Sequence, residues 1–320
     1  MHGEKNNNKI NEEAMKALLQ YRLMLILLLA FIVNLSAQDF VGIKQINGAG
    51  IFCRVLGKGE PLIVVHGGPG LSHNYLLKPF SQLAKNYKLI FYDQRGNGLS
   101  DEFKENDKFT IDSLVEELEG VRKEFGVDNI YLAGQSWGAI IAINYIAKYP
   151  QHVKKLLLLE PAPGSSDYLP DFRKRIMRKL SEAEKEELQK LSTNPSFKTD
   201  PVLYKKYRTI WFSAYYYDHQ KQDTTNLDYI DSNWLRKFHA SSAMFTPYLV
   251  TFNIYEKMKS ITCPLLIIHG YDDVIPNESI EKMKSIVPNA ELHIIKNCGH
   301  FVHVEKEKEY FELIREFLAK

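Results

Sequence analysis

Residues 129–147 of this 320-residue chain read Asn-Ile-Tyr-Leu-Ala-Gly-Gln-Ser-Trp-Gly-Ala-Ile-Ile-Ala-Ile-Asn-Tyr-Ile-Ala, with Gly134, Ser136 and Gly138 near the centre. The apolar run before Gly134 is typical of a buried strand, and the run after Gly138 is typical of a helix. Gly-x-Ser-x-Gly at such a junction predicts a nucleophile elbow, a turn so sharp that the serine is strained and both flanking positions need glycine. The turn lifts the hydroxyl above a helix N-terminus, where developing negative charge is favourable. We therefore predict that Ser136 is a catalytic nucleophile.

A serine hydroxyl needs a base to take its proton, and the base needs a carboxylate to orient it. With this elbow the chain order is serine, acid, histidine. Asp272 and Asp273 follow an apolar strand at residues 264–270, and His300 follows the next predicted strand at residues 291–295. We predict that His300 is the base. The spacing Gly-x-x-Asp favours Asp273 as the acid, while the distance to the next proline leaves Asp272 open.

An oxyanion formed at the substrate carbonyl needs backbone N–H donors. The apolar strand predicted at residues 61–65 ends in the sequence His-Gly-Gly-Pro-Gly, a loop with little side-chain bulk through which amides can approach a substrate. We expect one donor from this loop, from Gly68 or Gly67. The second donor should be the amide of Trp137, the residue after the nucleophile.

Strand and helix patterns alternate from residue 51 to 153 and again from 264 to 320, which predicts a mostly parallel sheet with helices on both faces. Between these regions the strands stop and helical, charged and aromatic segments take their place. We interpret residues 161–260 as a helical cap inserted after the sixth strand, with some of its aromatic side chains lining the pocket. Residues 38–160 and 261–320 then form the two parts of one hydrolase core.

The N-terminal segment carries an apolar run at residues 23–33 that is short for a membrane span. Lys16 and Arg22 precede this run, and Leu35-Ser36-Ala37 offers a small-residue cleavage site. We predict a secretory signal peptide at residues 1–37, cleaved after Ala37, and a secreted or periplasmic protein without a stable membrane span. The alternative is an uncleaved N-terminal anchor. The formal net charge of +2 gives no indication of a nucleic-acid partner.

Three motifs together are similar to those of the proline iminopeptidase family of α/β-hydrolases. They are His-Gly-Gly-Pro-Gly at residues 66–70, Asp-Gln-Arg-Gly-Asn-Gly-Leu-Ser at residues 93–100, and Gly-Gln-Ser-Trp-Gly at residues 134–138. The resemblance implies an eight-stranded α/β-hydrolase fold that removes N-terminal residues, preferentially proline, from short peptides without metal or cofactor. We interpret Asp93 and Arg95 of the second motif as a structural pair that braces the neighbouring loops.

The family binds the free amino group of its substrate with glutamates, mostly from the cap. Here the chain departs from the family, because no glutamate lies between Leu188 and Tyr255. Our candidate for binding the amine is Glu160, which follows the apolar strand at residues 156–159, because strand ends point into the site in such folds.

Two functional hypotheses follow, and a third is less favoured. The first is a secreted serine aminopeptidase that releases proline or another small residue from short peptides through an acyl-enzyme. The second is a carboxylesterase or lactonase with the same catalytic residues, and the third is a non-catalytic binding protein of the same fold. All three imply a small-molecule or short-peptide ligand, and no feature of the sequence sets an oligomeric state.

Overall fold

The computed structural model describes residues 39–320, except for residues 105–107, 226 and 228, and in the preceding segment only Met15, Gln20 and Arg22. The signal peptide expected at residues 1–37 therefore lies outside the described residues, apart from those three positions. Within the part of the chain that is described, none of the helices has the length and apolar character needed to cross a membrane.

A single mostly parallel sheet organises residues 40–320. Among the described residues it has eight strands, in the order β1-β2-β4-β3-β5-β6-β7-β8. The pairs β1–β2 and β2–β4 are antiparallel and the remaining pairs are parallel, which confirms the fold expected from the sequence. The strands are β1 (Phe40–Ile46), β2 (Ala49–Leu56), β3 (Glu60–Val65), β4 (Tyr87–Tyr92), β5 (Ile130–Gln135), β6 (Val153–Leu159), β7 (Leu265–Gly270) and β8 (Glu291–Ile295).

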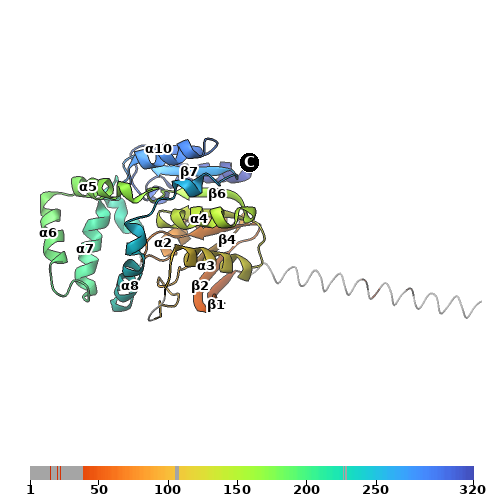
Figure 1. Cartoon of the computed structure of the whole chain (residues 1–320), viewed down its shortest axis with the longest axis horizontal. Coiled ribbons are helices and arrows are strands. Elements are labelled where there is room, and N and C mark those ends of the chain that lie inside the picture. The colour runs from red at the N-terminus through yellow and green to blue at the C-terminus, as the bar shows by residue number, and fades with distance from the viewer. Residues whose placement is uncertain are drawn as a thin grey trace, which may run out of the picture. The chain divides into compact units, whose positions relative to one another are not determined.

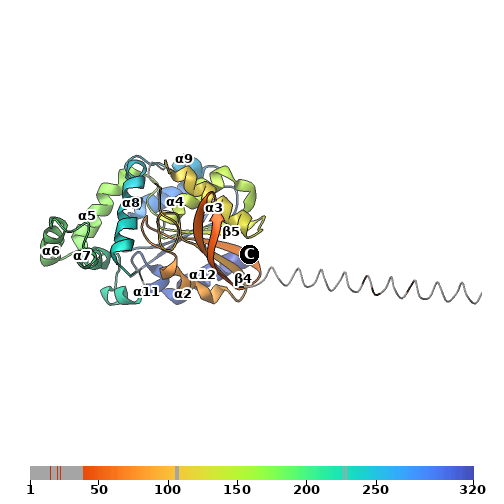
Figure 2. The same cartoon turned by 90° about the horizontal axis from the view of Figure 1, so that it is seen from below.

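Helices cover both faces of this sheet. Figure 2 shows α2, α11 and α12 on one face and α3, α4 and α9 on the other. The covering helices are α2 (Asn74–Phe80), α3 (Ile111–Glu124), α4 (Trp137–Lys148), α9 (Tyr255–Met258), α10 (Asn277–Ile286), α11 (Val302–Glu305) and α12 (Glu307–Ala319). Short 3₁₀ helices occur at Ser81–Leu83, Pro150–His152, Ser166–Tyr168 and His219–Thr224.

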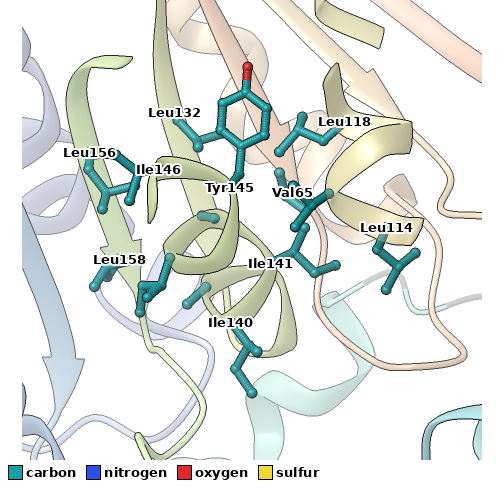
Figure 3. Close-up of a cluster of buried hydrophobic side chains, with 14 of the residues drawn as sticks. Val65, Leu114, Leu118, Leu132, Ile140, Ile141, Tyr145, Ile146, Leu156 and Leu158 are labelled. Atoms are coloured by element: carbon teal, nitrogen blue, oxygen red, sulfur yellow. The ribbon is translucent and has the colours of Figure 1, made fainter. Parts of the chain in front are cut away.

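The continuous apolar runs of the central strands are explained by burial on both faces. Because side chains alternate along a strand, Leu156 and Leu158 of β6 pack in the cluster beneath α4, whereas Leu157 and Leu159 pack in the cluster on the opposite face. Figure 3 shows the first of these clusters around α4. Each such fully buried leucine stabilises the fold by roughly 1.5–3 kcal/mol. The elbow therefore lies on a rigid support.

Four cap helices lie between β6 and β7 and are grouped beside the sheet in Figure 1. They are α5 (Leu169–Lys179), α6 (Glu182–Ser192), α7 (Pro201–Ser213) and α8 (Ser232–Leu249). The residues at which α6 and α7 begin are explained by side chains that cap a helix N-terminus. Ser181 and Glu184 form a capping box at α6, and the Asp200 side chain accepts hydrogen bonds from the first turn of α7, with Pro201 at the first helical position.

Candidate active site

Ser136 lies at the turn between β5 and α4, in the backbone conformation expected of an elbow. Its φ is 53° and its ψ is −119°, which a non-glycine residue adopts only under strain of about 1–3 kcal/mol. A Cβ on Gly134 would lie 2.4 Å from the Gly138 carbonyl oxygen, and one on Gly138 would lie 2.2 Å from the Val65 carbonyl oxygen. These contacts confirm that the two flanking positions require glycine.

His300 and Asp273 form a buried pair on the loops after β8 and β7. The His300 Nδ1 atom lies 2.8 Å from Asp273 Oδ2, and Asp273 Oδ1 accepts a hydrogen bond of 3.0 Å from the Ile275 amide. Burial raises the pKa of Asp273, but the neighbouring His300 and His269, together with these hydrogen bonds, more than offset it and hold the pKa below its ordinary value. Asp273 is therefore ionised at neutral pH and can hold His300 in the tautomer protonated on Nδ1.

Asp272 makes different contacts. Its amide donates to the Cys298 carbonyl over 2.9 Å, and its own carbonyl accepts a hydrogen bond of 2.6 Å from Lys179 Nζ. The structure thus brings Asp273, rather than Asp272, to His300. The catalytic roles of Ser136, His300 and Asp273 remain predictions that need enzymatic tests.

The loop after β3 is tied to the elbow by Tyr75 of α2. The Gly67 amide donates a hydrogen bond of 2.7 Å to the Tyr75 hydroxyl, which in turn donates over 2.7 Å to Gln135 Oε1. This amide is therefore already engaged, which leaves Gly68 as the donor that the loop can offer to an oxyanion. Sequence reasoning missed Tyr75, because it lies 60 positions before Gln135 and no local pattern marks it.

Asp93 and Arg95 do not form the pair expected from the sequence. Asp93 Oδ1 accepts hydrogen bonds from the amide of His73 and lies 2.7 Å from His73 Nδ1, while Asp93 Oδ2 accepts one from the Leu99 amide. Arg95 instead contacts Glu117, which accepts a 2.9 Å hydrogen bond from its amide. Each residue braces the loop after β4 through a separate partner.

Glu160 does not line the substrate cavity, and its role in binding an amine stays a prediction. The residue has no exposed surface, has a φ of 40° and is absent from the residues that line the cavity. Burial, and then the nearby negative charge of Asp273, raise the pKa of its carboxyl well above the ordinary value. The carboxyl is therefore enclosed and does not face the cavity. The sequence predicted correctly that Glu160 follows the strand β6, but it could not show that the side chain is fully buried and away from the cavity lining.

Two adjoining cavities meet at Ser136 and His300, which line both. The first, of about 300 Å³, is called the aromatic lobe because α7 and α8 contribute Tyr204, Tyr207, Trp211, Trp234 and Phe238 to it. The second lobe, of about 330 Å³, is lined by Trp137 and by apolar residues including Ile140, Phe172, Leu249 and Phe252. Both volumes are at the small end for ligand pockets, which fits a small substrate.

The charged residues of these lobes are unexpected for a site that binds amines. Among the described residues that line them none is acidic, and besides His300 the titratable basic groups are Arg208 in the aromatic lobe and Arg173 in the second lobe. Gly68 lines both lobes and Trp137 lines the second, so both predicted oxyanion donors lie in residues at the cavity.

Comparisons with known proteins show the family to which the chain belongs. The family model described as "alpha/beta hydrolase fold" matches residues 60–307. The chain is 31% identical over 289 residues to a proline iminopeptidase of Saccharolobus solfataricus, an alignment that covers 87% of this chain and 91% of that protein. It is 30% identical over 295 residues to a proline iminopeptidase of Thermoplasma volcanium, covering 87% of this chain and 96% of that protein.

Solved structures show the same fold at lower identity. The proline iminopeptidase of Mycobacterium smegmatis superposes with a TM-score of 0.66 at 19% identity, covering 88% of this chain and 98% of that one. An esterase of Exiguobacterium antarcticum superposes with a TM-score of 0.64 at 18% identity, covering 88% of this chain and 100% of that one.

Proposed function

We propose that this chain, a serine hydrolase that belongs to the proline iminopeptidase family of α/β-hydrolases, releases the N-terminal residue, proline or another small residue, from short peptides. The observation that carries the proposal is that Ser136 and His300, which is paired with Asp273, line the same small cavities together with residues of the cap helices. The relatives named proline iminopeptidase support the peptide substrate.

In this mechanism His300 takes the proton of the Ser136 hydroxyl as its oxygen attacks the scissile carbonyl, and Asp273 stabilises the imidazolium that forms. The amides of Gly68 and Trp137 stabilise the oxyanion, and loss of one such donor costs about 3–4 kcal/mol in the transition state. His300 then gives the proton to the leaving amine, so the shortened peptide departs and the N-terminal residue stays as an ester on Ser136. Water, activated by the same histidine, hydrolyses this ester.

Recognition of the substrate amine must work without a carboxylate among the described residues of the cavity. An ammonium ion left unpaired in a low-dielectric site is costly, so the neutral amine is the form that binds. Because α-amino groups have pKa values near 7.7–8.0, kcat/KM for unblocked substrates should keep rising above pH 7.5. Esters and N-acylated substrates lack this group, so their kcat/KM should not show this additional rise.

The second candidate is a carboxylesterase or lactonase, and the cavity lining favours it specifically. A lining without acidic side chains suits an uncharged ester, which needs no partner for an amine. The catalytic steps are otherwise the same, so the two candidates differ only in the substrate.

One panel of substrates distinguishes these candidates. Purified protein is assayed against Pro- and Ala-p-nitroanilide, N-acetyl-Ala-p-nitroanilide and short-chain p-nitrophenyl esters, with Ser136→Ala protein as the background. Aminopeptidase activity predicts turnover of the free-amine anilides and a strong loss on acetylation. Turnover of the esters alone, or faster cleavage of the acetylated anilide, would move the assignment to the esterase.

Export of the protein is part of the proposal. It is supported by the apolar run at residues 23–33 and the small residues before Gln38. The measurement is the N-terminal sequence and intact mass of protein from the natural host. A chain that begins at Gln38 supports export with cleavage, whereas a chain that keeps residues 1–37 supports an anchor.

A further inference from the structure

A short segment of the cap, residues 214–218, contacts both loops that carry the Asp273–His300 pair. It follows α7, and its residues Ala214 and Tyr216 are fully buried. The carbonyl of the residue between them, Tyr215, accepts a hydrogen bond of 2.6 Å from the His300 amide. The Tyr215 ring also lies edge-on to the imidazole, with the ring centres 5.3 Å apart, and lines both lobes of the cavity. The cap therefore contacts the predicted catalytic base directly.

Lys179, the last residue of α5, joins this segment to the loop of Asp273. Its Nζ atom donates hydrogen bonds to the carbonyls of Ala214 over 2.9 Å, Tyr216 over 3.3 Å and Asp272 over 2.6 Å. An ammonium group has three N–H donors, which matches these three acceptors. Because the acceptors are backbone carbonyls, the contact holds main-chain positions rather than flexible side chains.

The bond to the Asp272 carbonyl acts on the peptide group that leads into the acid. This carbonyl and the Asp273 amide belong to one planar peptide group, and the amide donates over 3.1 Å to the Gly270 carbonyl. The peptide group is thus held on one side by Lys179 and on the other by the end of β7. Burial lowers the pKa of Lys179, and the negative charges of Asp273 and Asp272 partly offset this, which agrees with an ammonium group close to the acid.

Glu305 makes the corresponding connection at the loop of His300. Its Oε2 atom accepts a hydrogen bond of 2.7 Å from the Gly299 amide, and its Oε1 atom accepts one of 2.7 Å from the Asp218 amide, at the end of the cap segment. A Cβ on Gly299 would lie 2.2 Å from the Tyr215 carbonyl oxygen, so the loop approaches the segment as closely as only glycine allows. Both members of the pair are therefore held against the same cap segment.

We propose that Lys179 is a positioning residue, which holds Asp273 in the orientation that His300 needs by joining its loop to the cap. The inference rests on the catalytic roles proposed above for Asp273 and His300, but not on the substrate being a peptide. A displacement of about 1 Å at a catalytic group can lower a rate about 100-fold. Placement of the cap and alignment of the acid are then coupled, because one ammonium group bonds to both.

The first experiment measures the reactivity of Ser136 independently of the natural substrate. Diisopropyl fluorophosphate reacts with an activated serine with loss of fluoride, and intact mass gives the rate for the wild type, Lys179→Met, Lys179→Arg and the control Lys174→Met. Methionine keeps a long unbranched side chain without a donor, and Lys174 is an exposed lysine of the same helix. Labelling should be about 10 to 100 times slower in Lys179→Met and unchanged in Lys174→Met. Arginine, which offers several donors, should restore part of the rate.

The second experiment separates positioning from a general loss of stability. Melting temperatures are measured for every variant, and labelling is carried out well below the lowest of them, where nearly all of the protein is folded. Lys179→Met is then combined with Asp273→Asn. Because a positioning residue acts through the acid, Lys179→Met should slow labelling far less in this background than in the wild type. If Lys179→Met does not fold, Lys179→Gln, which keeps two donors on a shorter side chain, takes its place with the same expected ranking.

Three results would overturn the proposal. They are labelling of folded Lys179→Met at the wild-type rate, equal slowing by this substitution in both backgrounds, or equal slowing by Lys174→Met. If peptides and anilides are not cleaved but labelling depends on Lys179 through Asp273, peptide cleavage fails while the positioning role stands. The two failures are thus distinguishable.

Discussion

Replacement of Glu160 by glutamine tests whether the buried carboxyl of this residue holds a proton in the folded chain. In the folded chain the carboxyl has no exposed surface, and burial followed by the charge of Asp273 raises its pKa well above the ordinary value. The unfolded chain binds the same proton with a pKa near 4.3. The stabilising contribution of the protonated group is therefore complete below pH 4.3 and is lost as the pH rises through the folded-state pKa.

Between these two pKa values the folded chain holds one proton more than the unfolded chain. Its free energy of unfolding then falls by about 1.4 kcal/mol for each pH unit on account of Glu160 alone. Glutamine has nearly the shape of the protonated carboxyl and does not titrate. The free energy of unfolding of Glu160→Gln should therefore differ least from that of the wild type at acidic pH. As the pH rises, the variant should become more stable relative to the wild type.

Urea unfolding between pH 5 and 8, followed by tryptophan fluorescence, measures this difference. The exposed Glu278→Gln, which removes a carboxylate 3.2 Å from Arg175, is the matched control and should run nearly parallel to the wild type. A neutral Glu160 would be refuted if the free energy of unfolding of Glu160→Gln ran parallel to that of the wild type across this pH range. It would also be refuted if the variant lost stability relative to the wild type as the pH rose. A selective rise in KM for free-amine substrates would support the role of Glu160 in binding the amine.

Two further substitutions test the geometry around Ser136. Asp273→Asn should lower kcat by about 10⁴-fold, because the histidine loses its orienting carboxylate. Asp272→Asn should keep kcat within about threefold of the wild type. The reverse ranking in steady-state kinetics would transfer the acid role to Asp272. Tyr75→Phe leaves the Gly67 amide and Gln135 Oε1 without their 2.7 Å partner, which should cost about 1–3 kcal/mol of stability and lower kcat roughly tenfold with KM little changed. A lower melting temperature with unchanged kcat would show that Tyr75 serves only the fold.

The elbow could be predicted from the sequence because its conformation depends on residues that follow one another in the chain. Gly134 and Gly138 are required by backbone atoms within the same turn and the adjacent strand, and the apolar strand and helix around them are read directly. The order of strands along the chain likewise places Asp273 and His300 on neighbouring loops, because parallel strands end at the same edge.

Features that depend on side-chain direction or on distant segments could not be predicted. Glu160 follows the last residue of β6, but it is fully buried and does not line the cavity. Tyr75 reaches Gln135 only because α2 packs against the same face of the sheet. The stacking of Arg208 on Trp234 joins two cap helices whose relative packing no local pattern encodes.

The central claim is that Ser136 is the nucleophile of a serine hydrolase, and one measurement tests it most directly. The kcat/KM of purified Ser136→Ala is compared with that of the wild type on the best substrate of the panel, with circular dichroism to verify folding. In a serine protease, loss of the nucleophile lowers kcat about a million-fold, so activity should fall to the background. Retention of more than a few per cent of wild-type activity by the folded variant, free of contaminating hydrolases, would contradict the account.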